Sequence, residues 1–94
     1  MLTSTSRFET TTASKYLQAL CKHFAHKVPV TYDALTGEAA LPPGTARLRA
    51  DEGGLDIEVT AADADKLARV QHIVEDHLLR FAFRDAPGPL VWSD

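Results

Sequence analysis

The stretch Ala46-Arg-Leu-Arg-Ala-Asp-Glu-Gly-Gly-Leu-Asp-Ile-Glu-Val-Thr60 decides the fold. Apolar and charged residues alternate on both sides of Glu52-Gly53. A period of two is typical of a strand that buries one face, because successive side chains point to opposite sides. A two-residue loop that contains glycine favours a tight connection between neighbouring strands. The stretch therefore predicts an antiparallel hairpin with one apolar and one charged face.

The charges of this hairpin select its register. With a two-residue loop, Arg49 faces Asp56 and Arg47 faces Glu58. A shifted register that pairs residues 52 and 55 keeps the apolar side chains inward but retains only an Arg49–Glu58 pair. Two cross-strand ion pairs, at roughly 0.2–1 kcal/mol each, favour the first register.

Other extended segments surround the hairpin. Residues 3–9 are rich in threonine and serine, which predicts a short edge strand. Alternating apolar residues predict two more strands, one around Val30 and one that ends at Leu41, with turn residues between them. A further short strand near Val91 would end the chain.

Two segments have the period of a helix instead. Apolar residues at helical spacing predict one helix over 12–27 and another over 63–83. Pro29 ends the first helix, because proline biases the residue before it away from the α region. Thr60 followed by Asp63 resembles a capping box before the second helix. The predicted buried stripes consist of Ala13, Leu17, Leu20, Cys21 and Phe24 in the first helix, and of Leu67, Val70, Val74, Leu78 and Phe81 in the second.

These elements predict an α+β fold in the order β-α-β-β-β-β-α. Each helix has one apolar face and so has the sheet, so both helices are expected on one face of an antiparallel sheet of four or five strands. With 94 residues, of which 45% are hydrophobic and 24% charged, the chain suits one domain over 1–94 with one core.

Composition also argues against several classes of function. The net charge of -3 offers no basic footprint for nucleic acid. No stretch approaches the ~20 apolar residues of a membrane span, and the polar start lacks the apolar segment of a secretory signal. The single cysteine, Cys21, suits a reducing compartment. We therefore expect a cytoplasmic protein with neither nucleic acid nor membrane as its partner.

Histidines near the ends of the two predicted helices are the candidates for chemistry. His23 and His77 both lie at the border between the buried and the exposed face. If the helices pack side by side, the two imidazoles face one groove with Tyr16, Arg80 or Arg84 nearby. This predicts a small polar pocket for a metal, a haem or an anionic ligand. Alternatively, both are boundary histidines that donate hydrogen bonds to backbone carbonyls or to a carboxylate.

The remaining candidates are weaker. His23 and His26 share a side of the first helix at a spacing of three residues and could bind one metal ion together. Cys21 faces another direction and is expected in the core, and a helix C-terminus disfavours a thiolate. No nucleophile or oxyanion site is recognisable, so no catalytic residue and no cofactor is assigned. An enzyme with His23 or His77 as its general base is the least favoured hypothesis.

Three stretches resemble a known bacterial family of small domains, domain of unknown function 2218. They are Leu2-Thr-Ser-Thr5, Leu20-Cys-Lys-His-Phe-Ala-His-Lys-Val-Pro-Val30 and Glu75-Asp-His-Leu-Leu-Arg-Phe-Ala-Phe-Arg84. The likeness covers nearly the whole chain. Some related modules accompany siderophore-interacting flavin reductases, so the resemblance implies a link with iron handling and such a reductase as partner. The positions that it singles out are Cys21, His23, Phe24, His26, His77, Arg80, Phe81 and Arg84.

Two functions are therefore expected. The leading hypothesis is a small non-enzymatic binding module, with a polar groove between the helix ends and a connection to iron or siderophore metabolism. The alternative is a structural or oligomerisation domain that acts through an exposed strand edge or the Phe83–Trp92 surface, for example as a homodimer.

Overall fold

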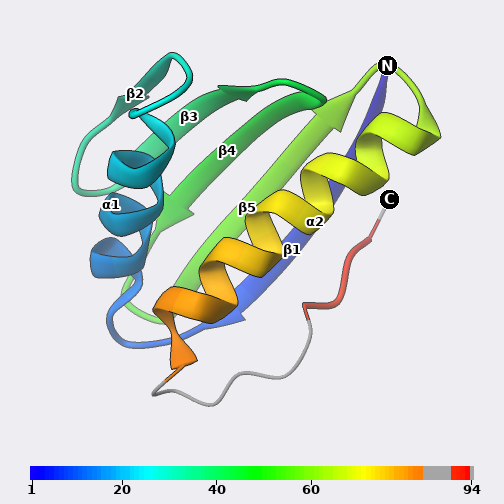
Figure 1. Ribbon diagram of the computed structural model, residues 1–94. Helices are drawn as coiled ribbons and strands as arrows, with labels where there is room; N and C mark the ends of the chain where they lie inside the picture. Colours follow the sequence, from blue (N-terminus) through cyan, green and yellow to red (C-terminus); the bar gives the residue numbers. More distant parts are fainter. Residues whose placement is uncertain (84–89, 94) are drawn as a thin grey trace.

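The computed structural model describes residues 1–83 and 90–93. An antiparallel sheet carries both helices on one face, as predicted (Figure 1). The elements are β1 (Leu2–Glu9), α1 (Ala13–Phe24), β2 (Val30–Tyr32), β3 (Thr36–Leu41), β4 (Gly44–Ala50), β5 (Gly54–Ala61) and α2 (Ala64–Phe81). The strands lie in the order β1-β5-β4-β3-β2. The predicted α+β class and the order β-α-β-β-β-β-α are confirmed.

The two edges of the sheet differ. Strand β1 lies at one edge, as predicted, and pairs along its whole length with β5. On its outer side, Ser93 forms a single antiparallel bridge with Thr5, through backbone hydrogen bonds of 2.7 and 2.8 Å. The short strand expected near Val91 is thus reduced to this one bridge in the described part of the tail. The other edge is β2, which is only three residues long.

The register of the central hairpin is the predicted one. Arg49 lies opposite Asp56, and Arg47 lies opposite Glu58. Only the second of these pairs is an ion pair, with 3.2 Å between Nη1 and Oε1. Strand β1 also places Arg7 opposite Asp56, and Arg7 binds that carboxylate at 2.7 Å. Asp56 therefore pairs with Arg7 instead of the expected Arg49, because β1 lies beside β5.

The hairpin loop is held by Asp51. Its Oδ1 accepts the backbone N–H groups of Gly53 and Gly54, both at 2.8 Å, and Nη2 of Arg7 at 2.9 Å. These bonds favour the carboxylate form. The pKa of Asp51 falls to about 2, mainly through the hydrogen bond from Arg7 and then through that from Gly53.

This lowered pKa predicts how the loop responds to acid. A carboxylate whose pKa is lower in the folded state stabilises the fold above its unfolded pKa of 3.8, and the contribution is lost as the pH falls through about 2. We expect Asp51→Asn to be less stable than the wild type at neutral pH, and its stability to fall less steeply between pH 3.8 and pH 2. Urea unfolding at a series of pH values measures both slopes, and parallel slopes would contradict the prediction.

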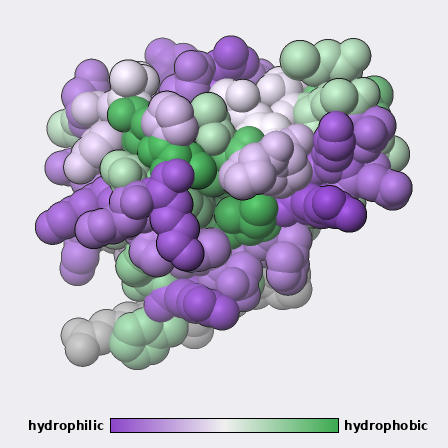
Figure 2. Space-filling view, turned by 45° about the horizontal axis from the view of Figure 1, so that its top comes forward, coloured by the Kyte–Doolittle hydropathy of each residue, from purple (hydrophilic) through white to green (hydrophobic). Residues whose placement is uncertain are grey.

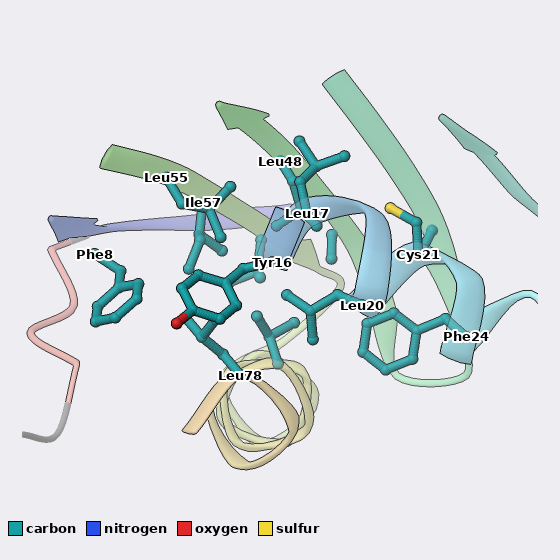
Figure 3. Close-up of a cluster of buried hydrophobic side chains, with 14 of the residues drawn as sticks. Phe8, Tyr16, Leu17, Leu20, Cys21, Phe24, Leu48, Leu55, Ile57 and Leu78 are labelled. Atoms are coloured by element: carbon teal, nitrogen blue, oxygen red, sulfur yellow. The ribbon is translucent and has the colours of Figure 1, made fainter. Parts of the chain in front are cut away.

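The core lies between the helices and the sheet. Its largest side chains include Leu17, Leu20, Leu55, Ile57 and Leu78, all fully buried (Figure 3). The predicted stripes are buried except at Phe81, which is 38% exposed, so this prediction was wrong. The reason is the spacing of the stripe: four residues beyond Leu78 the buried position falls on Ala82.

The start of α2 also corrects a prediction. Thr60 belongs to β5 and takes no part in a capping box. Asp63 is the N-cap, and its carboxylate accepts the backbone N–H of Lys66 at 2.8 Å. Both helices are shorter than predicted, ending at Phe24 and Phe81. Within the described residues, neither helix is both long and apolar enough to span a bilayer.

Candidate functional site

The two helices bring His23 and His77 together. Their ring centroids are 4.8 Å apart and the ring planes are inclined by 43°. His23 is the last residue but one of α1, on the flank of the stripe that buries Leu20 and Phe24. His77 precedes the buried Leu78 of α2. Helical geometry places both imidazoles at the border of the core, so the predicted convergence is present in the structure.

A groove of about 320 Å³ opens beside this pair. Its walls come from the end of α1, the segment after it, the turn between β3 and β4, and α2. Figure 2 shows hydrophobic side chains at the bottom of hollows in a largely hydrophilic surface. The apolar floor consists of Phe24, Val28, Leu41, Pro42 and Ile73, and the polar rim of His23, His26, Lys27 and His77. None of the described residues that line this groove is acidic.

One ring nitrogen of His77 forms a hydrogen bond with the backbone. Nδ1 lies 2.6 Å from the carbonyl oxygen of Ile73. A carbonyl oxygen only accepts hydrogen bonds, so Nδ1 carries the hydrogen and donates it. In the neutral ring, Nε2 is then the unprotonated nitrogen and is available to a ligand. The alternative prediction of a boundary histidine that donates to a backbone carbonyl is therefore correct for Nδ1. Nε2 remains able to bind a ligand.

The surroundings of His23 favour its neutral form. Its pKa is lowered from 6.5, first by desolvation and then by repulsion from His77 and His26. The rings of Phe24 and Phe81 contact it nearly edge-on, with centroids 5.9 and 6.0 Å away. Phe81, which is missing from the core, thus covers one side of His23. A neutral imidazole has a lone pair for a proton or a ligand.

The other residues predicted for the site do not all reach it. Tyr16 is buried in the core against Phe8, with ring centroids 5.8 Å apart, and does not line the groove (Figure 3). Arg80 pairs with Asp76 at 3.2 Å on the surface of α2, near enough to His23 to contribute to its lowered pKa. Arg84 lies outside the described residues.

The described residues around the groove provide few ligands for a metal ion. Within residues 1–83 and 90–93, no three histidine, cysteine, aspartate or glutamate side chains are grouped so that they could hold one. His26 lines the rim, but it does not complete such a set with His23. Cys21 is buried, as predicted, and desolvation raises the pKa of its thiol to about 11. It therefore stays protonated at neutral pH.

Apart from Phe24 in the predicted buried stripe, local sequence patterns gave no sign of the groove's floor. Leu41 ends β3, Pro42 begins the turn between β3 and β4, and Val28 lies in the connection after α1. Pro42 is recognisable only as a turn residue, because nothing local shows that β3 carries this turn toward the histidines. Ile73 falls beside the apolar stripe of α2 and is only half-buried. These positions follow from the sheet order rather than from a motif.

Comparisons with known proteins agree with the fold. The chain is similar to PA4090 from Pseudomonas aeruginosa, whose structure was determined by NMR, with 31% sequence identity and a TM-score of 0.82. The match covers 99% of this chain and 96% of that one. No curated protein matches the chain significantly. A family model described as an uncharacterised protein conserved in bacteria matches residues 5–93, so the chain belongs to the domain of unknown function 2218 family.

Proposed function

We propose that the chain is a small binding module without catalytic activity, and that it binds its ligand in the groove beside His23 and His77. The ligand combines an apolar or aromatic part with a negative charge. One observation carries this proposal: the groove has an apolar floor, and every titratable group on its rim is basic. Ligand sites are typically apolar concavities with a few polar groups that fix orientation.

The charge of the rim contrasts with the rest of the chain. The net charge is -3, yet the groove presents Lys27 and three histidines without a lining carboxylate. A bound anion would offset the repulsion that lowers the pKa of His23. Ligand binding would then raise the lowered pKa of His23 toward its ordinary value, so affinity should rise as the pH falls through 6.5 and below.

A zinc-like metal ion has less support, and a haem ligand stays a prediction. Structural zinc sites need four ligands and catalytic ones three, whereas the two imidazoles supply only two. In this proposal, the predicted link with iron would therefore come through an iron-chelating small molecule rather than through a metal ion held by the two histidines. Catechol-type iron chelators join an aromatic ring to anionic oxygens and fall within the ligand class that the groove favours. That link, and an association with siderophore-interacting reductases, stay predictions.

The proposal is tested with 8-anilinonaphthalene-1-sulfonate, an aromatic sulfonate that fluoresces when bound to apolar surface. We expect the wild-type protein to bind it, and His23→Ala/His77→Ala to bind about tenfold more weakly, which corresponds to roughly 1.4 kcal/mol. Fluorescence titration measures the affinity, and near-ultraviolet circular dichroism verifies that the variant keeps its fold.

The matched control is Arg49→Ala, which removes a cation from the opposite face of the sheet. It should bind the probe like the wild type. If the double histidine variant also binds like the wild type, or if no protein binds, the proposed function is wrong.

The oligomerisation alternative has one favourable observation. In the described part of the sheet, β2 is the edge that no further strand covers, and both Tyr32 at its end and Leu35 after it are exposed. The surface predicted around Phe83 and Trp92 is less suitable. Phe83 is exposed, but Trp92 packs on α2 and donates its indole N–H to Glu75 at 2.9 Å. A homodimer through β2 stays a prediction.

A further inference from the structure

A second hollow adjoins the groove. It has a volume of about 520 Å³ and shares Pro42 and Ile73 with the first, so the two hollows meet at the turn between β3 and β4. Its rim carries Lys66, Arg69 and His72, which project from the exposed side of α2. The two hollows together follow α2 from Lys66 to His77, a distance of about 16 Å at 1.5 Å per residue.

Among the described residues, every titratable side chain that lines the combined groove is basic. All four histidines of the chain line it, together with Lys27, Lys66 and Arg69. No carboxylate of the described residues lines either hollow. Within the described residues, neither Lys66 nor Arg69 forms an ion pair, so both cations are available. A cationic concavity on a protein of net negative charge focuses its field on anionic partners.

We infer that this combined groove binds an acidic, partly apolar segment of a partner protein in extended conformation. The inference rests on the proposed function and specifies its ligand. At about 3.3 Å per residue, the groove accommodates about five residues of an extended chain. Side chains of such a chain alternate, so apolar residues would reach the floor while acidic residues reach the cations of the rim.

The shape of the groove favours a polypeptide over a small molecule. Sites for small molecules bury most of the ligand surface. Here Pro42, Lys66, Arg69 and His72 are exposed, so the second hollow is open to solvent along its length. The recessed part of the floor, at the buried Leu41 and the half-buried Ile73, would not be reached by a flat bilayer. The recessed floor and the open sides together suit a chain of alternating side chains.

The test uses a fluorescein-labelled peptide with the sequence Gly-Ser-Glu-Leu-Glu-Phe-Glu-Ser-Gly and the full chain. We expect fluorescence anisotropy to rise on binding, and the affinity to fall as salt is added. Lys66→Ala/Arg69→Ala should weaken peptide binding by about tenfold. The same variant should bind the naphthalene sulfonate like the wild type, because that small probe needs only the hollow beside His23 and His77.

A charge-matched control distinguishes peptide binding in the groove from nonspecific electrostatic attraction to the protein. Lys15→Ala/Arg49→Ala removes the same charge from residues outside both hollows and should bind the peptide like the wild type. A peptide with glutamine in place of glutamate should not bind. The inference is overturned if the labelled peptide does not bind, if both double variants lose affinity equally, or if the glutamine peptide binds as well.

Two further outcomes keep the proposals apart. If the peptide fails but the naphthalene sulfonate still depends on His23 and His77, the partner segment is excluded and the small-ligand function stands. If the sulfonate does not depend on the histidines, the proposed function itself fails. The last experiment uses vesicles that contain phosphatidylglycerol. If the protein binds these vesicles through Lys66 and Arg69 but does not bind the peptide, the inferred partner segment is wrong and the groove binds a membrane surface instead.

Discussion

Replacing Leu17 with alanine is expected to lower the free energy of unfolding by about 3–5 kcal/mol. The side chain is fully buried and points from α1 toward the sheet (Figure 3). Its Cδ2 lies 3.5 Å from the position that a Cβ on Gly37 would occupy, so it packs closely on β3. The substitution removes apolar contacts and leaves a cavity between two rigid elements, which relax only partly. Urea unfolding followed by circular dichroism measures the loss.

The same substitution at Leu35 is the control. Leu35 precedes β3 and is 60% exposed, so its truncation should change stability by less than about 0.5 kcal/mol. Both variants make the same Leu→Ala change in the unfolded chain, so the difference between their losses of stability mainly reports burial in the folded state. Equal losses in the two variants would mean that Leu17 is not packed as the structure places it.

The hairpin shows how far the sequence determines the fold. Its register was predictable, because alternation decides which side chains face inward and charge pairs distinguish the two candidate registers. Its ion pairs were predictable only in part. Asp56 binds Arg7 rather than Arg49, because β1 lies beside β5. Local patterns do not say which strand from elsewhere in the chain becomes a neighbour.

The candidate site, too, was predictable from the sequence only in part. Counting positions around each helix placed His23 and His77 at the core border, and their convergence needed only that the helices pack on one face. Tyr16 was misplaced because its flank of α1 contacts Phe8 on β1, which helical counting alone does not reveal. Most floor residues were not predictable, because the turn after Leu41 reaches the groove only through the order of the strands.

Replacing Gly44 with alanine is expected to lower the free energy of unfolding by about 3 kcal/mol. Gly44 begins β4 and lies opposite Ala61 of β5. A Cβ there would overlap the carbonyl oxygen of Thr60 and lie 3.1 Å from the Cβ of Ala61. The overlapping atom belongs to the backbone and cannot swing aside, so the pairing of β4 with β5 must shift. Denaturant unfolding measures the loss, with thermal unfolding as a second readout.

Gly53→Ala is the matched control, because it adds the same methyl group in the hairpin loop. There the nearest atom is Nη2 of Arg7 at 3.3 Å, the end of a flexible side chain that can move. Its effect should stay within about 1 kcal/mol. Gly44 also ends the turn that carries Pro42, so Gly44→Ala should displace the wall shared by the two hollows and weaken binding of the naphthalene sulfonate. A stable Gly44→Ala protein with unchanged binding would show that β4 and β5 tolerate wider spacing than the structure indicates.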